Sequence, residues 1–170
     1  PIWVLNKSKF FINKNFKKLM EGNINLLQSR RSKVVNPILP IKECKEIYRI
    51  LGHLIGDGSA PKAHQPTYIN SCKELREQFK NDLKIFGKFT ITEQNFNPTP
   101  GIRFSSILGR ILSHIFKINF TYPNRLPKKV WDTNKNNKKE ILKAIFDDEG
   151  TIAPRLAISM KSRNIINEIK

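Results

Sequence analysis

Two apolar segments of this sequence end in an acidic residue followed by glycine. RILGHLIGDGS places Asp57 before Gly58, and KKEILKAIFDDEGTI places Glu149 before Gly150. A carboxylate at a helix C-terminus faces unpaired carbonyls and the negative end of the helix dipole, which costs about 0.3 to 1 kcal/mol at an exposed site. Either acid alone is explained by a turn, since Asp and Gly favour the positions after helices. The same placement in both segments instead predicts a compensating cation.

Small residues predict how the two helices meet. Gly52 and Gly56 are four residues apart and share one helix face, and Ala144 is the matching small residue of the second helix. Helices packed through this strip, with Gly52, Gly56 and Ala144 at the interface, would bring Asp57 next to Glu149. Two hard oxygen ligands would then repel each other, and Mg²⁺ or another divalent ion would relieve the repulsion.

The composition predicts an anionic partner. Among 170 residues, 31 Lys and Arg stand against 14 Asp and Glu, which gives a formal charge of +17. Nucleic acid is the first expectation, because phosphate neutralisation releases counterions. The charge is too large for solubility alone, and no single basic amphipathic helix concentrates it as membrane-surface binding would require. No apolar run approaches the roughly 20 residues of a bilayer span and no secretory signal is present, so we expect a cytoplasmic protein or one of an organelle matrix.

Hydrophobic periodicity predicts an α+β fold made of two copies of one unit. Residues 1–40 keep no period for long and are expected to be a basic N-terminal extension or linker. Residues 41–120 read as helix, two strands, helix, two strands and helix, and 121–132 as a connection. Residues 133–170 begin a second, incomplete copy of this αββαββα unit. We therefore expect a monomer with pseudo-twofold symmetry.

Polar side chains alternate with apolar ones along the expected strands, as in KFTITEQN and GIRFSS. Each is by itself explained by a solvated strand face, but the set has the side-chain types that bond phosphates and base edges. The predicted DNA-binding residues are Lys62, His64, Gln65, Tyr68, Asn70, Lys88, Thr90, Thr92, Gln94, Arg103, Ser105 and Arg155.

The segments ILGHLIGDGS and LKAIFDDEGT resemble the paired signature motifs of the LAGLIDADG homing endonucleases, particularly the dodecapeptide type of archaeal introns and inteins. RLPKKVW before the second motif is similar too, so the resemblance covers about residues 38–170. It implies a saddle of antiparallel sheets on a long asymmetric DNA target, with Asp57 and Glu149 as catalytic, metal-binding acids and a divalent metal, which we take to be Mg²⁺, that activates water. The predicted metal site comprises Asp57, Glu149, Gly56 and Asp148.

The function expected from this resemblance is a site-specific double-strand DNA endonuclease. An RNA-splicing maturase that binds intron RNA, or a non-cleaving DNA-binding protein on the same fold, is the alternative. A basic structural protein without a metal site is a third reading. The second copy lacks its last strands and closing helix in this sequence, so we expect the chain as written to cleave poorly.

Overall fold

The computed structural model describes residues 3–4, 26–29, 32–39, 41–60, 65–152, 155 and 157–169. Helices alternate with short, mostly antiparallel strands along the chain, so the expected α+β class is confirmed. None of the helices in this part of the chain is long and apolar enough to cross a membrane.

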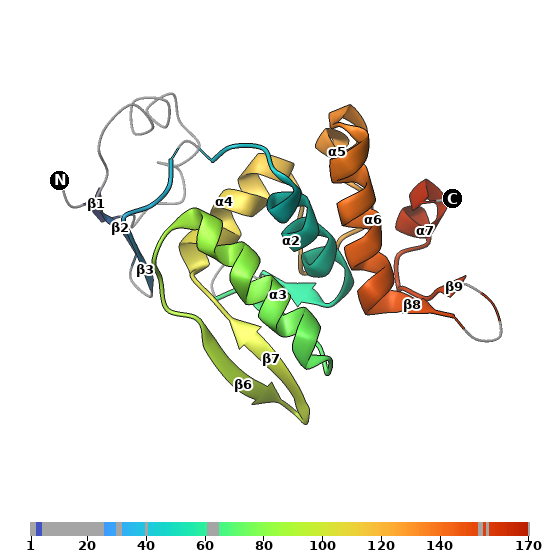
Figure 1. Ribbon diagram of the computed structural model, residues 1–170, viewed down its shortest axis with the longest axis horizontal. Coiled ribbons are helices and arrows are strands. Elements are labelled where there is room, and N and C mark those ends of the chain that lie inside the picture. The colour runs from blue at the N-terminus through green and yellow to red at the C-terminus, as the bar shows by residue number, and fades with distance from the viewer. Residues whose placement is uncertain are drawn as a thin grey trace.

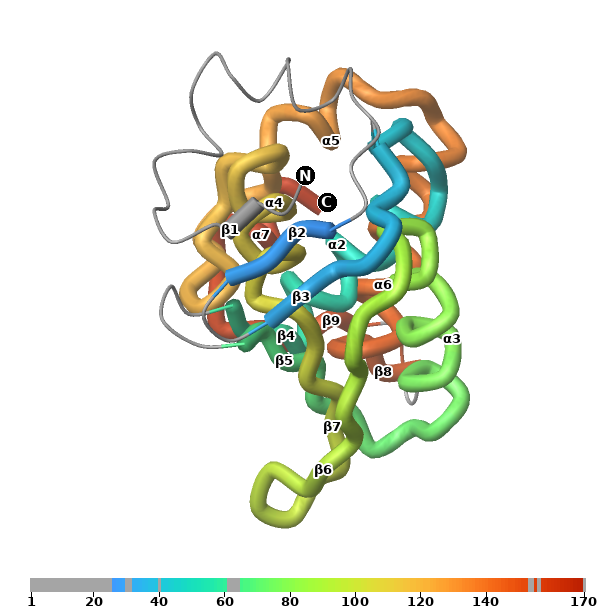
Figure 2. The backbone as a smooth tube through the Cα atoms, turned by 90° about the vertical axis from the view of Figure 1, so that its left-hand side faces the viewer, coloured from blue at the N-terminus to red at the C-terminus, as the bar shows by residue number. Residues whose placement is uncertain are grey.

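The first half of the chain forms a four-stranded antiparallel sheet covered by helices (Figure 1). The elements of this half are α2 (Lys45–Gly56), β4 (Gly58–Ser59), β5 (Thr67–Ile69), α3 (Lys73–Leu83), η2 (Lys84–Phe86), β6 (Thr92–Phe96), β7 (Thr99–Arg103) and α4 (Ser106–Phe116). Neighbouring strands follow the order β4-β5-β7-β6, and the β6–β7 hairpin extends away from the body of the molecule (Figure 2).

The core lies between this sheet and its helices. Helix α2 buries Ile50, Leu51 and Leu54 completely, as their helical spacing predicts. Tyr68 of β5 pairs with Ile102 of β7, and neither side chain is exposed. Helix α2 is thus packed against the core along its apolar face, and Asp57 follows its last residue as the C-cap.

The second half begins with a short helix inside the predicted connection, α5 (Lys128–Asp132). It continues with α6 (Lys135–Glu149), β8 (Gly150–Thr151), β9 (Ala157–Ile158) and α7 (Arg163–Ile169). Helix α6 begins where the Asn134 side chain accepts a hydrogen bond from the Asn137 N–H at 3.0 Å. It packs along α2, and the β8–β9 pair and α7 follow its far end (Figure 1).

The N-terminal segment corrects one expectation, because its described part belongs to the core. Strand β2 (Leu26–Ser29) pairs antiparallel with β3 (Ser32–Val35) and parallel with β1 (Trp3–Val4). Leu27 and Val34 are buried at 3% and 0% exposure. The described strands β2 and β3 are therefore part of the domain rather than a linker outside it, since a linker would leave Leu27 and Val34 in water.

The same hairpin also changes the start of a predicted strand. Val35 and Lys88 exchange backbone hydrogen bonds of 2.6 and 2.9 Å as an isolated bridge. The first part of KFTITEQN is thus paired with the N-terminal segment, and β6 begins only at Thr92. Phe89 and Ile91 still pack against the core, as their alternation predicts.

Candidate metal site at the paired helix ends

Helices α2 and α6 approach through their small residues. A Cβ atom placed on Gly52 would lie 2.6 Å from the Cβ of Ala144 and 2.7 Å from the backbone oxygen of Ile141. One turn later, a Cβ on Gly56 would lie 2.8 Å from the Cβ of Asp148. The structure therefore brings Gly52, Gly56 and Ala144 together at one interface, with the two acidic ends beside each other.

The two helix ends make the same backbone hydrogen bond to the strand pair that follows each of them. The carbonyl of Asp57 accepts a hydrogen bond from the N–H of Ile69 at 3.1 Å, just beyond the residue that pairs with β4. The carbonyl of Glu149 accepts one from the N–H of Ser159 at 3.0 Å, just beyond the residue that pairs with β8. Each acid thus closes its helix and opens a short antiparallel strand pair.

Glycine is required at both of these turns for a steric reason. A Cβ on Gly58 would collide with the backbone of Leu54, and a Cβ on Gly150 would collide with the carbonyl oxygen of Phe146. In both cases the clash is with the residue four positions earlier, in the last helical turn. Glycine is therefore needed after each acid for the chain to leave the helix in this direction.

Asp57 and Glu149 line one open hollow of about 860 Å³, which we call the acid hollow. Both residues are half-buried. Among the side chains that share its lining are Asn124, Ser159, Lys161 and Ser162. Two acids, a cation and several hydroxyl or amide groups therefore face the same space.

The ionisation of both acids is shifted by this placement. Burial is the main cause that raises the pKa of Asp57 to about 6, and the nearby Asp148 carboxylate adds to the rise. Burial likewise raises the pKa of Glu149 to about 7, with the negative charge of Asp57 as the next cause. Lys161 lowers the pKa of Glu149 in part. A divalent cation bound in the hollow would stabilise both ionised carboxylates.

Asp148 is not open to a metal ion, which corrects its assignment as a ligand. Its side chain is 0% exposed. Oδ1 accepts hydrogen bonds from the Tyr68 hydroxyl at 2.7 Å and the Asn70 amide at 3.1 Å, and His53 Nδ1 lies 3.0 Å from Oδ2. Both oxygens are therefore occupied by protein donors. Burial still raises the pKa of Asp148, while the hydrogen bond from His53 opposes the rise.

Part of the predicted DNA-binding set is buried instead. Tyr68, Asn70 and Ser105 were expected on the outer sheet face, but they are 0%, 8% and 1% exposed. The first two contact Asp148 from the inner side of the sheet, and Ser105 caps α4 by accepting a hydrogen bond from the N–H of Ile107 at 3.3 Å. The expected outward orientation is wrong for these three residues, because α2, α6 and α4 supply partners that the strand pattern does not contain.

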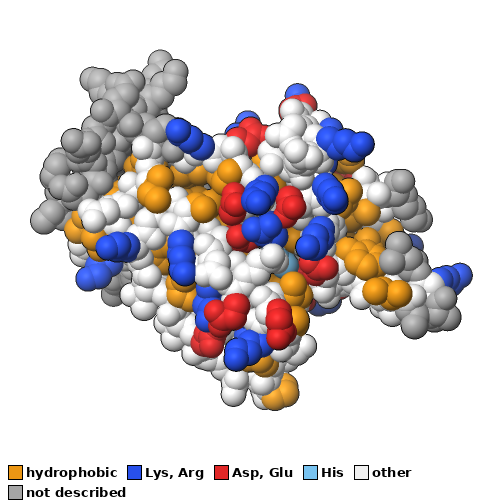
Figure 3. Space-filling model, in the orientation of Figure 1, with side chains coloured by type: hydrophobic (Ala, Val, Ile, Leu, Met, Phe, Trp, Pro, Cys, Tyr) orange, Lys and Arg blue, Asp and Glu red, His pale blue; other side chains and the backbone are white. Residues whose placement is uncertain are grey.

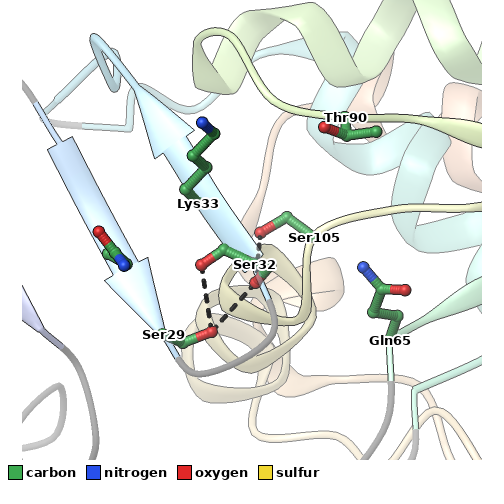
Figure 4. A pocket seen from close by; sticks show the side chains of 7 residues that line it. Ser29, Ser32, Lys33, Gln65, Thr90 and Ser105 are labelled. Carbon is green, nitrogen blue, oxygen red and sulfur yellow. Dashed lines mark hydrogen bonds between the residues drawn. The ribbon is translucent and has the colours of Figure 1, made fainter.

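The other members of that set lie at or near the surface. Lys88, Thr90, Thr92 and Arg155 are exposed, and Gln65, Gln94 and Arg103 are partly exposed. Gln65, Thr90 and Ser105 line a polar pocket with Ser29, Ser32 and Lys33 of the N-terminal hairpin (Figure 4). Lys62 and His64 lie outside the described residues.

On the visible face, the charged side chains of the described residues are spread out rather than gathered into one patch (Figure 3). On the face in Figure 3, Lys and Arg side chains are spread over most elements, and acidic side chains are interspersed with them near the middle. Arg103 of β7 lies over the ring of Phe96, 5.4 Å from its centroid.

The donor set at the acid hollow limits which metal it suits. Within the described ranges, no group of three or more His, Cys, Asp or Glu side chains is placed to hold a metal ion. Mg²⁺ usually takes one or two carboxylates and keeps several waters. Asp57 and Glu149 supply two carboxylates, which fits this coordination of Mg²⁺.

Comparison with known proteins found a distant relative that matches this chain over part of its own length. No family model matches the chain. The chain is 28% identical over 146 positions to the glutamine–fructose-6-phosphate aminotransferase (isomerizing) of Methanocaldococcus jannaschii. The match covers 79% of this chain but 13% of the relative, so this chain spans a small part of that protein's length.

This comparison contradicts the function expected from the sequence. The relative is named for an aminotransferase and isomerase, not for a nuclease or a nucleic-acid-binding protein. We therefore withdraw the site-specific DNA endonuclease, its alternatives as a maturase or a non-cleaving DNA-binding protein, and the association with introns and inteins. Double-stranded DNA as a binding partner is a separate expectation that this comparison does not test. The enzymatic roles of Asp57 and Glu149 stay predictions.

Proposed function

We propose that the facing ends of α2 and α6 bind a divalent metal ion, with Mg²⁺ as the expected ion and Asp57 and Glu149 as its ligands. The observation that carries this proposal is the convergence of two half-buried carboxylates on one hollow at the ends of two packed helices. Gly56 lines the same hollow, and its predicted part in the site stays a prediction. A bound ion would lower the pKa of its water ligands, which is the chemistry that such a site supplies to an enzyme.

The proposed partner of the metal site is a phosphate-bearing polyanion. A formal charge of +17 favours an anionic ligand, and a metal ion in the acid hollow would add a contact for phosphate oxygens. Lys88, which precedes β6, is exposed, and Arg103 of β7 is partly exposed. Double-stranded DNA, the partner predicted from the sequence, is the first probe for this binding.

The finer part of the expected fold, a duplicated unit with pseudo-twofold symmetry, belongs to the same proposal. Its support is local: both helices end in an acid and a glycine, and both acid carbonyls accept a hydrogen bond from the following strand pair. A duplicated unit explains why two acids reach one hollow, because related helices packed side by side end at related places.

Calorimetric titration of the metal-free protein with Mg²⁺ tests the site. We expect one bound ion in the wild type and loss of binding in Asp57→Asn and Glu149→Gln. The exposed neighbour Asp147 supplies a matched control, since Asp147→Asn removes an equal charge outside the hollow. Equal affinity in the wild type, Asp57→Asn and Glu149→Gln would refute the site.

The anisotropy of a labelled DNA duplex, measured at several salt concentrations, tests whether the protein binds a phosphate-bearing polyanion. We expect affinity to fall linearly on a log–log plot against salt concentration, and Lys88→Ala and Arg103→Ala each to reduce the slope by about 1. Lys143→Ala, on α6 outside the sheet, serves as the charge-matched control. Binding without salt dependence would contradict a partner recognised by its phosphates.

The comparison favours a second candidate, a part in sugar phosphate metabolism like that named for the relative. In that case the ligand of the acid hollow would be fructose 6-phosphate, whose phosphate Lys161 and a metal ion could contact. This candidate ranks second because the match covers 13% of the relative. Titration of the metal-loaded protein with fructose 6-phosphate decides it, and an absence of binding eliminates it.

A further inference from the structure

One amide group connects the ends of the two helices. Nδ2 of Asn70 donates hydrogen bonds to Asp57 Oδ2 at 2.8 Å and to Asp148 Oδ1 at 3.1 Å. Asn70 lies directly after β5, so it stands between α2, which ends at Asp57, and α6, which carries Asp148. A single side chain therefore contacts an acid from each helix.

The orientation of this amide is determined by its surroundings. Oδ1 of Asn70 accepts a hydrogen bond from the N–H of Cys72 at 2.8 Å, and its backbone carbonyl accepts one from Arg76 at 2.8 Å. A flipped amide would place its NH₂ group against the N–H of Cys72 and its oxygen against two carboxylates. The NH₂ group thus has to face Asp57 and Asp148.

Asp148 is itself held on its remaining sides. Tyr68 donates to Oδ1 at 2.7 Å, and His53 Nδ1 lies 3.1 and 3.0 Å from the two oxygens. In the tautomer with its proton on Nδ1, His53 donates to this carboxylate. The side chains of His53 and Asp148 are both 0% exposed, so water does not compete for these contacts.

We propose that Asp148 is a positioning residue for the metal site: it fixes the Asn70 amide, and through that amide it sets the direction of the Asp57 carboxylate. The inference rests on the proposed function. Asn70 occupies Oδ2 of Asp57, and no described residue donates to Oδ1, which leaves that oxygen for the ion. The ligand on α2 is thus oriented by a residue of α6, and the site forms only where the two helices are packed.

Asp148 lies at a position of the α2–α6 interface where a small residue would be expected. It follows Ala144 by four residues, so both lie on the α6 face that meets α2, and Gly56 leaves the room for it. Placing a buried carboxylate at a helix interface requires several donors. His53, Tyr68 and Asn70 supply these donors. Asn70 also donates a hydrogen bond to Asp57, and it thereby connects Asp148 to the proposed metal ligand.

The test measures Mn²⁺ affinity together with NMR signals of two side chains, the Asn70 amide group and the Asp57 carboxyl carbon. Asp148→Leu keeps a similar size but removes the acceptor, and we expect Mn²⁺ binding to weaken about 10- to 100-fold, as for other hydrogen-bond partners of metal ligands. Asp148→Asn keeps one oxygen for Asn70 and should recover most of the affinity. Both NMR signals should move in Asp148→Leu and return in Asp148→Asn.

Two further variants separate positioning from folding. Asn70→Ala leaves the contacts among Asp148, His53 and Tyr68 in place, so it tests the connection even if Asp148→Leu does not fold. Asp147→Asn, the exposed neighbour, should change neither the affinity nor the NMR signals. Unchanged affinity and unchanged Asp57 signals in both Asn70→Ala and a folded Asp148 variant without an acceptor would overturn the inference.

Failure of the proposed function is recognised separately. If the wild type binds no Mn²⁺, the metal site is wrong, while movement of the Asp57 carboxyl signal in Asp148→Leu or Asn70→Ala still reports the positioning connection. If the wild type binds Mn²⁺ and neither variant changes that affinity, the metal site stands and the positioning role is refuted.

Discussion

The Cβ atom of Ala144 lies 2.6 Å from the place where a side chain on Gly52 would begin. At this point α2 and α6 have no room for anything larger than a hydrogen atom on one side and a methyl group on the other. Because the Ile141 carbonyl lies beside the same place, the contact is made by backbone as well as by side chain. The separation of the two helix ends, and so of Asp57 and Glu149, depends on this contact.

Gly52→Ala should destabilise the protein even though alanine favours helices by about 1 kcal/mol. The added methyl group overlaps Ala144 and a backbone oxygen that has little freedom to move, and overpacking of this kind costs about 1 to 3 kcal/mol or more. Urea denaturation measures the change in free energy of unfolding. The double variant Gly52→Ala with Ala144→Gly should recover part of the loss, because the contact with Ile141 remains.

Lys143→Ala on the exposed side of α6 is the control for this series. It should change the free energy of unfolding by no more than about 0.5 kcal/mol, as surface substitutions usually do. A stabilising Gly52→Ala would show that the helices can separate without loss, which contradicts the close approach.

The metal-free protein should become less stable as the pH rises from 4 to 7. The folded state raises the pKa of Asp57 from 3.8 to about 6 and that of Glu149 from 4.5 to about 7. Between the unfolded and folded values the folded state binds more protons than the unfolded state, so the free energy of unfolding falls with rising pH. Urea midpoints at pH 5 and pH 8 in the presence of EDTA measure this contribution.

The double variant Asp57→Asn with Glu149→Gln is the matching control, because neither amide titrates in this range. Its urea midpoint should fall less between pH 5 and pH 8 than that of the wild type. An identical fall in both proteins would show that other groups cause the pH dependence.

Mg²⁺ should raise the Tm of the wild type more at pH 8 than at pH 6. The ion binds the ionised carboxylates, and protons compete with it for Asp57 and Glu149 in this range. A ligand that binds the folded state alone stabilises it by mass action. Scanning calorimetry with and without Mg²⁺ at both pH values gives the comparison, and equal shifts in Asp57→Asn would count against this site.

Arg49 should be the ion-pair residue whose loss costs most among the described pairs. Its Nε and Nη2 donate to the two oxygens of Asp82, both at 2.6 Å, and Nη1 donates to Glu140 at 2.7 Å. Arg49→Met would leave Asp82, with a side-chain exposure of 6%, without its cation, which costs about 3 to 5 kcal/mol. Urea denaturation measures the loss.

Lys80→Met provides the exposed counterpart. Lys80 pairs with Glu77 and Glu93, whose side chains are 48% and 49% exposed, so its removal should cost about 0 to 1 kcal/mol. Similar losses in Arg49→Met and Lys80→Met would show that the pairing of α2 with α3 and α6 through Arg49 adds little.

Local patterns in the sequence were sufficient to predict that the ends of the two helices lie side by side. The spacing of Gly52, Gly56 and Ala144 predicted a close helix contact because it depends on residues within one or two turns. The same holds for the α+β class, since helical and strand periods are properties of neighbouring residues. The function inferred from those patterns is the part that the comparison contradicts.

The hydrogen bonds around Asp148 could not be predicted from such local patterns. A signal was present, because Asp148 follows Ala144 at the spacing that Gly56 follows Gly52, which places it on the interface face. Its partners nevertheless come from elsewhere: His53 and Asp148 are 95 positions apart, and Tyr68 is 80 positions away. Strand alternation alone assigned Tyr68 and Asn70 to the outer face.

The amino-acid sequence by itself determined that two helices end in an acid and a glycine and that small residues allow them to touch. Only the tertiary structure decided that the N-terminal hairpin joins the core through Leu27 and Val34, and that Asp148 is buried while Asp57 and Glu149 face the hollow. The reason is physical: periodicity reports the face on which a side chain lies, whereas burial and hydrogen bonding depend on which distant segment covers that face.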